Sequence, residues 1–201
     1  MIKFLNAENQ QFSLVRQSTH YLDGEGWVEV VQVGIAGHRA ICQEDLPVIK
    51  AEINDRLLKI QNQYKDKSIC LLSGLAEGAD RLVVWIALEL GMPFKVVLPM
   101  ALSDYIADFK TQSSLDEFYS LLKYAACVEA LLSISPMTKD NRDLCYQQLA
   151  IYLANNADVL IALWDGDTPE KPGGTSQVVR YFREVKLNNT DMFEHISIKR
   201  V

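Results

Sequence analysis

The chain has 201 residues, of which 49% are hydrophobic and 23% are charged, so we expect one large globular domain with an ample core. A formal net charge of -6 argues against a general nucleic-acid binder, and the lack of polybasic blocks argues against a membrane surface as partner. Small anionic ligands stay compatible with this charge, because a local pocket can be positive on an acidic protein.

The sequence carries no recognisable targeting segment or metal motif. Its first residues, MIKFLNAENQQ, lack an apolar stretch with a cleavage site, and no window reaches the roughly 18 to 20 apolar residues of a membrane span. Four cysteines are scattered without a CxxC pair: Cys42, Cys70, Cys127 and Cys145. Three histidines share no ligand spacing: His20, His38 and His195. We expect a reduced, cytoplasmic protein without metal or cofactor, in which Cys70 and Cys127 are core residues.

Short apolar runs alternate with segments of helical period. Runs that are apolar at nearly every position suit strands of a parallel sheet covered on both faces. They occupy residues 28–36, 68–73, 94–99, 127–134 and 158–165. Helices are predicted between them, at residues 45–64, 78–91, 141–157 and 173–185. Two weaker strands are FSLVRQ, as an edge strand within residues 1–26, and HISIKR near the C-terminus.

This alternation predicts an α/β fold, a Rossmann-like, doubly wound and mainly parallel sheet with helices on both faces. We expect a single domain whose core spans about residues 28–186. The stretch 101–123 interrupts the rhythm as a loop and a short helix. Its polar centre, KTQSS, makes it a candidate lid, and a surface insertion packed on the sheet edge is the alternative. Ligands of such sheets bind outside the carboxyl ends of the strands, so the residues after each strand are the functional candidates.

The first buried strand ends in VGIAGHR. Gly34 and Gly37 let the backbone turn and approach a ligand, and Arg39 beside His38 offers a bidentate partner for a phosphate or carboxylate. A turn without a ligand is the alternative. The stretch is neither GxGxxG nor a P-loop, which argues against hydride transfer and NTP hydrolysis.

The second strand leads into a glycine-flanked helix start, SGLAEGADRL. Such a helix N-terminus suits an anion through its N–H groups and its dipole. The ligand candidates are Ser73, Gly74, Gly78, Asp80 and Arg81. The plain structural alternative is a first-turn acid at Asp80, a capping Glu77 and a solvated Arg81.

The last strong strand leads into WDGDTPEKPGGTSQVV. Its candidates are Asp165, Gly166, Gly173, Gly174 and Thr175, and a flexible loop with an ordinary Thr cap is the alternative. Tyr146 and Arg142 lie one turn apart in the preceding helix, which lets both face the same edge, although a core or surface tyrosine is the commoner case.

Together VGIAGHR, SGLAEGADRL, ADVLIALWDG and PGGTSQVV resemble the SLOG superfamily, the Rossmann-like group that includes the DprA/Smf and LOG ("lonely guy") proteins. The likeness is to a bacterial branch with a GHR turn, a GADR helix start and a WDG…GGT end. It implies a nucleotide or nucleotide-derived ligand at the carboxyl edge of the sheet, often in a homodimer. The positions that match the family's ligand turns are Gly37, Arg39, Gly74, Gly78, Asp80, Gly173, Gly174 and Thr175.

The sequence departs from the LOG phosphoribohydrolases in the last loop. Their PGGxGTxxE motif carries a glutamate that assists cleavage of the base–ribose bond. This chain has Val178 three residues beyond Thr175, and Gln177 cannot act as a carboxylate base. The departure argues against LOG-type hydrolysis.

Three functions follow, in this order. The first is a sensor-type module that binds a nucleotide derivative and acts on a separate effector chain. The second is an N-glycosidic-bond enzyme, a hydrolase or deoxyribosyltransferase, with Asp80, Asp165 and Glu77 as candidate catalytic carboxylates. The third, DprA-like binding of single-stranded DNA, conflicts with the acidic charge.

Overall fold

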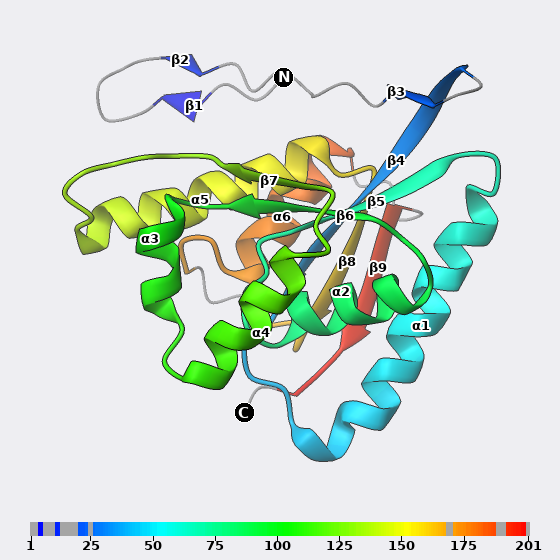
Figure 1. The fold of residues 1–201 in the computed structure, drawn as a ribbon, viewed down its shortest axis with the longest axis horizontal. Helices are drawn as coiled ribbons and strands as arrows, with labels where there is room; N and C mark the ends of the chain where they lie inside the picture. Colours follow the sequence, from blue (N-terminus) through cyan, green and yellow to red (C-terminus); the bar gives the residue numbers. More distant parts are fainter. Residues whose placement is uncertain are drawn as a thin grey trace.

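The computed structural model describes residues 4–5, 11–12, 20–23, 26–167, 171–187 and 192–199, with side chains from residue 29 onward. Its main sheet has the strand order β7-β6-β5-β4-β8-β9, with β3 antiparallel on β4 (Figure 1). The strands are β3 His20–Asp23, β4 Gly26–Gly37, β5 Ser68–Ser73, β6 Phe94–Leu98, β7 Cys127–Ala130, β8 Val159–Trp164 and β9 Phe193–Ser197. All neighbours from β7 to β9 are parallel. Two short strands, β1 Phe4–Leu5 and β2 Gln11–Phe12, form a separate antiparallel pair.

Helices connect the strands and cover both faces of the sheet. They are α1 Leu46–Gln63, α2 Ala79–Glu89, α3 Leu102–Tyr105, α4 Gln112–Leu122, α5 Lys139–Asn156 and α6 Thr175–Val185, with 3-10 turns η1 Gln43–Asp45 and η2 Ile106–Asp108. The predicted α/β fold, Rossmann-like and parallel, is therefore confirmed.

The alternation of side chains along the strands divides the core into two layers. In β4, Val31, Val33 and Ile35 pack with α1, α2 and the segment around α4, whereas Ala36 packs with α5 and α6. The predicted apolar face of α1 is buried as expected, at Ile49, Ile53, Leu57 and Ile60. Strands buried on both faces explain the uninterrupted apolar runs of the sequence.

The strand at one edge of the sheet is shorter than predicted. The run 127–134 yields only β7, and this strand has a single neighbour, β6. Cys127 is consequently exposed and Cys70 is half-buried, so the prediction that both are core residues was wrong. At the other edge the predicted final strand exists as β9, parallel to β8. Of FSLVRQ only Phe12 belongs to a described strand, β2, and residues 13–17 lie outside the described residues.

The segment 101–123 forms α3, η2 and α4, and it is anchored by aromatic side chains. Tyr105, Phe109 and Phe118 are buried and in mutual ring contact, with centroids 4.9 Å apart for Phe109 and Phe118 and 5.2 Å apart for Tyr105 and Phe109. They belong to the same core cluster as α1 and α2. The helices of this segment are thus packed on the sheet through rings rather than attached at their ends alone.

The order of the strands creates a switch point between β4 and β8. From β4 the chain proceeds outward through β5, β6 and β7, and α5 then carries it back to β8 on the other side of β4. The GHR and WDG sequences therefore leave neighbouring strands at the same edge, in register at Gly37 and Leu163. This is the place where ligands bind in open parallel sheets. Across the described part of the chain, no helix is long and apolar enough to span a membrane.

Candidate functional site

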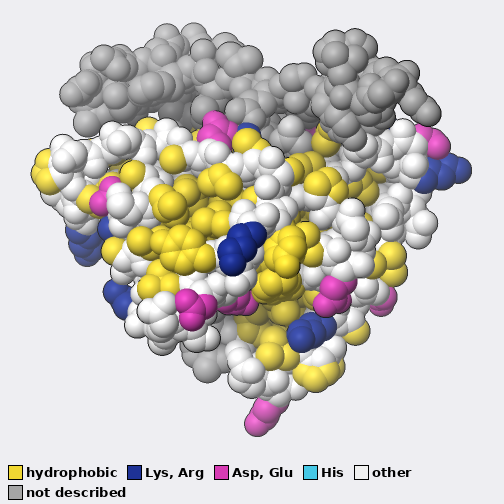
Figure 2. Space-filling view, in the orientation of Figure 1, with side chains coloured by type: hydrophobic (Ala, Val, Ile, Leu, Met, Phe, Trp, Pro, Cys, Tyr) yellow, Lys and Arg dark blue, Asp and Glu magenta, His cyan; other side chains and the backbone are white. Residues whose placement is uncertain are grey.

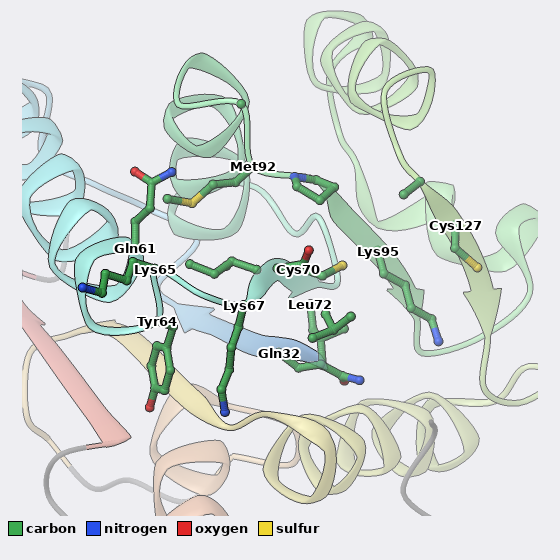
Figure 3. A pocket seen from close by; sticks show the side chains of 16 residues that line it. Gln32, Gln61, Tyr64, Lys65, Lys67, Cys70, Leu72, Met92, Lys95 and Cys127 are labelled. Carbon is green, nitrogen blue, oxygen red and sulfur yellow. The ribbon is translucent and has the colours of Figure 1, made fainter. Parts of the chain in front are cut away.

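Two cavities lie at opposite ends of the parallel strands, one at their amino ends and one at their carboxyl ends. One, of about 770 Å³, lies between the end of α1 and the first residues of β5, β6 and β7 (Figure 3). Two of its lysines are already paired, Lys67 with Glu29 at 3.0 Å and Lys95 with Glu129 at 2.5 Å. The other, of about 660 Å³, opens at the carboxyl ends of β4 and β8 and is lined by the GHR turn, η2, α5 and the start of α6. We call it the β4–β8 cavity, and it is the candidate site because of its position and its charges.

His38 ties the ends of the two central strands together. Its backbone N–H donates to the carbonyl of Leu163 at 3.1 Å, which extends the ladder of β4 and β8. Its Nε2 lies 3.2 Å from the backbone N of Asp165 and 3.1 Å from Oδ1 of that residue. These contacts join the GHR turn to the WDG loop at the carboxyl ends of β4 and β8.

Arg39 enters a chain of polar contacts across the cavity. Its Nη2 donates to the Tyr146 hydroxyl at 2.9 Å, and that hydroxyl donates to the carboxylate of Asp108. Nη1 of Arg142 donates to the same carboxylate at 2.9 Å. Burial and the bond to Asp108 raise the pKa of Tyr146 to about 12, so the hydroxyl keeps its proton at neutral pH. We call this arrangement the Arg39–Tyr146–Asp108–Arg142 relay.

Asp80 is a buried carboxyl group in the wall of the cavity. Its Oδ2 accepts from Oγ of Ser73 and from the backbone N–H of Ala76, both at 3.4 Å. Burial raises the pKa of Asp80 to about 7, because the charged form loses more hydration than these hydrogen bonds restore. The carboxyl group is therefore poised between acid and carboxylate near neutral pH.

The N-terminus of α6 opens on the cavity and has no side-chain cap. Thr175, its first residue, is buried and polar. The backbone N–H of Gly173 donates to Oε1 of Gln177 at 2.7 Å, so this glutamine holds the loop. An uncapped helix start attracts negative charge through its N–H groups.

The glycines of the three turns pack chain against chain. A Cβ at Gly37 would come within 2.3 Å of Cβ of Ala79, and one at Gly173 within 2.3 Å of Cβ of Tyr146. A Cβ at Gly78 would lie 2.2 Å from the Arg39 carbonyl oxygen, where φ is also +79°. Their role in the described structure is to let the walls of the cavity meet closely.

Several predicted residues stand behind the cavity wall. Arg81 is only 1% exposed and donates to the carbonyls of Leu75 at 3.0 Å and Ser114 at 2.8 Å, so the alternative of a solvated arginine does not hold. Glu77 accepts from the Ser114 hydroxyl and does not line the cavity. The candidates outside the lining are Ser73, Gly74, Gly78, Arg81, Asp165 and Gly166.

The cavity is also lined by charged side chains that were not among the predicted site residues. They are Asp108, Lys110, Lys139, Asp143 and Lys171. Asp108 and Lys110 belong to the connection after β6 but lie beyond α3, so a search of the residues directly after each strand does not reach them. Lys139 and Asp143 share a helical face with Arg142 and Tyr146. Within the described ranges, no group of three or more His, Cys, Asp or Glu side chains is placed to hold a metal ion.

No protein-family model and no curated protein matches the sequence. Among solved structures, DNA processing protein A (DprA) from Streptococcus pneumoniae aligns with a TM-score of 0.49 and 15% identity, over 78% of this chain and 48% of that chain. DprA from Helicobacter pylori, described for its single-stranded DNA binding mode, aligns with a TM-score of 0.45 and 17% identity, over 78% and 62%. The Moco carrier protein of Chlamydomonas rheinhardtii aligns with a TM-score of 0.33 and 14% identity, over 85% of this chain and 91% of that chain.

The chain spans less than two thirds of the length of either DprA chain. These likenesses concern the Rossmann-type fold. The expectation that nucleic acid is not a partner rests on net charge alone and stays a prediction.

Proposed function

We propose that the protein binds a nucleotide or nucleotide-derived ligand in the β4–β8 cavity, as a sensor-type module of the SLOG kind. The observation that carries the proposal is the charge of the cavity on a protein of net charge -6. Five basic side chains line it, Arg39, Lys110, Lys139, Arg142 and Lys171, against three acidic ones, Asp80, Asp108 and Asp143. A positive cavity in an acidic protein concentrates an anion at one place.

Arg39 is the proposed phosphate partner. Only its Nη2 is hydrogen-bonded within the described residues, which leaves Nε and Nη1 for a ligand. Tyr146 joins this guanidinium to the start of α6, because Gly173 lies directly against the tyrosine backbone. A phosphate between Arg39 and the uncapped helix start meets a guanidinium and backbone N–H groups together. The buried side chains of Leu153, Trp164 and Val178 provide an apolar surface for a base.

Ligand-observed NMR tests the proposal with nucleoside monophosphates, cyclic nucleotides, deoxynucleosides, ADP-ribose derivatives and a short single-stranded DNA. We expect saturation transfer to at least one nucleotide, and its loss in Arg39→Ala. Arg180→Ala is the matched control, because Arg180 is exposed on α6 and pairs with Glu184 outside the cavity. Unchanged transfer in Arg39→Ala removes Arg39 from the site. Preference for the DNA in place of the nucleotides contradicts the ligand class.

The second candidate is an N-glycosidic-bond enzyme, and the observation that favours it is the burial of the Asp80 carboxyl group in the cavity wall. A buried carboxyl group with a pKa near 7 in a cavity wall suits general acid–base work or stabilisation of a positive anomeric carbon. Release of free base in the same NMR tube, abolished in Asp80→Asn, would make the protein an enzyme. Intact anomeric signals over hours favour the sensor.

A further inference from the structure

The face of α5 that lines the β4–β8 cavity changes character along the helix. From its N-terminus inward the lining residues are Lys139, Arg142, Asp143, Tyr146, Leu149, Ala150 and Leu153. Lys139 is exposed, Arg142 and Tyr146 are half-buried, and Ala150 and Leu153 are buried. At the rise of an α-helix, Lys139 and Tyr146 are about 10 Å apart along the axis, and Tyr146 and Leu153 are about 10 Å apart again. The cavity therefore has an apolar inner end, a middle at Tyr146 and Arg39, and a cationic outer end.

Three exposed lysines from separate parts of the chain line the cavity. Lys139 begins α5, Lys110 precedes α4 and Lys171 precedes α6, and all three line the same cavity. All three are exposed, and none forms an ion pair with a described residue. Of the three lysines that line the opposite cavity, Lys67 and Lys95 are paired, whereas Lys65 forms no ion pair with a described residue. We call Lys110, Lys139 and Lys171 the outer lysines.

The acidic groups of the cavity do not neutralise the outer lysines. Asp108 is bound by Arg142 and Tyr146 within the relay, and Asp80 is buried on the inner side. Asp143 is the remaining lining carboxylate, and no ion pair joins it to a described lysine or arginine. Three cations and one acid thus face the entrance, which leaves an excess of about two positive charges there.

We infer that the ligand of this cavity carries a chain of at least two phosphate groups, the first held by Arg39 and α6 and the distal ones by the outer lysines. The inference rests on the proposed function. The backbone of Lys139 lies about 10 Å from that of Tyr146 along α5. The Debye length at physiological ionic strength is about 8 Å, so one phosphate at Arg39 leaves the positive charge at the start of α5 largely uncompensated. Lysine ammonium groups on flexible stems suit terminal phosphates as point charges, whereas the single Arg39 fixes the orientation.

Base-free polyanions test this inference without knowledge of the base. Isothermal titration calorimetry with inorganic phosphate, pyrophosphate and tripolyphosphate compares the wild type with the triple variant Lys110→Gln, Lys139→Gln and Lys171→Gln. The control triple variant carries Lys50→Gln, Lys123→Gln and Lys199→Gln, which remove the same charge at exposed positions outside the cavity. We expect the wild-type and control affinities to rise at least tenfold from phosphate to tripolyphosphate.

In the outer-lysine variant we expect that rise to shrink to threefold or less, while the affinity for inorganic phosphate stays the same. An equal rise in all three proteins, or no rise in the wild type, overturns the inference. If phosphate and tripolyphosphate bind with equal affinity, and Arg39→Ala abolishes the binding of both, the inference is overturned while the proposed function stands. No binding of any of the three anions, or binding that Arg39→Ala leaves unchanged, overturns both.

Discussion

The hydroxyl of Tyr146 accepts a hydrogen bond of 2.9 Å from Nη2 of Arg39, a residue 107 positions earlier in the chain. The same hydroxyl donates to Asp108, which Arg142 holds from the other side. The guanidinium of Arg39 is thus positioned by α5 and by the 3-10 turn η2, in addition to the turn after β4 to which it belongs. The relay places the proposed phosphate partner where α6 begins, because Gly173 packs on Tyr146.

Tyr146→Phe should weaken anion binding and leave the fold intact. The change removes the hydroxyl that orients Arg39 and keeps the ring, so we expect about a three- to tenfold loss of pyrophosphate affinity, equivalent to about 1 kcal/mol. Calorimetric titration measures the loss. Tyr181→Phe is the control, since its hydroxyl accepts from Gln147 of α5 at 3.3 Å and Tyr181 does not line the cavity. Equal affinities of wild type and Tyr146→Phe would show that Arg39 does not depend on the relay.

Asp80→Asn should change how stability depends on pH. The native pKa of about 7 lies above the ordinary value of 3.8, so the native protein binds more protons than the unfolded chain between these values. Stability from this group is therefore full at low pH and falls as pH rises toward 7. The variant lacks that fall, so its stability relative to wild type should increase from pH 5 to pH 8, by on the order of 2 kcal/mol.

Urea unfolding of both proteins across that pH range measures the difference. The exposed Asp55, replaced by Asn, controls for the loss of one carboxylate. A constant difference between Asp80→Asn and wild type at every pH would mean that Asp80 titrates alike in the native and unfolded states.

Arg81→Met should destabilise the protein without altering the ligand site. The buried guanidinium holds the carbonyls of Leu75 and Ser114 and pairs with Glu117 at 3.0 Å, so its loss leaves buried acceptors without a donor. We expect urea unfolding to show a free energy of unfolding lower by on the order of 3 kcal/mol. The pyrophosphate affinity of the folded variant should be unchanged. Arg180→Ala, at an exposed pair, should cost less than about 1 kcal/mol. A weakened affinity of folded Arg81→Met would return Arg81 to the site.

Gly173→Ala should push the loop before α6 away from α5. Gly173 and Gly91 both have positive φ, +68° and +72°, but only the Cβ at position 173 would meet another atom, at 2.3 Å, whereas nothing lies within 4 Å at position 91. Gly91→Ala therefore reports the backbone strain alone, about 1 kcal/mol. We expect Gly173→Ala to be less stable than Gly91→Ala and to bind pyrophosphate more weakly. Equal stabilities by urea unfolding would show that the loop shifts without cost.

The sequence predicted the sheet well because its central strands are buried on both faces. Runs such as 68–73 and 158–165 leave little choice of structure, whereas β7 at the edge has one neighbour and ends early. The turns with His38 and Arg39 were found by the rule on strand ends. Lys139 and Lys171 were not, because a lysine at a helix start has no local pattern that separates a ligand contact from a solvated charge. Arg81 was misplaced because its partners, 33 and 36 positions away, come from the 101–123 segment.

The residues of the relay are far apart in the sequence, so the cavity can form only after the whole segment from β4 to α5 has folded. The members of the relay come from the end of β4, from η2 and from α5, so a nascent chain that stops before α5 has no binding site. Ligand affinity is in this sense a property of the completed tertiary structure. A ligand that binds the native state alone raises the melting temperature by mass action. A thermal-shift screen of small phosphorylated compounds can therefore identify the ligand from the protein alone, before any partner is known.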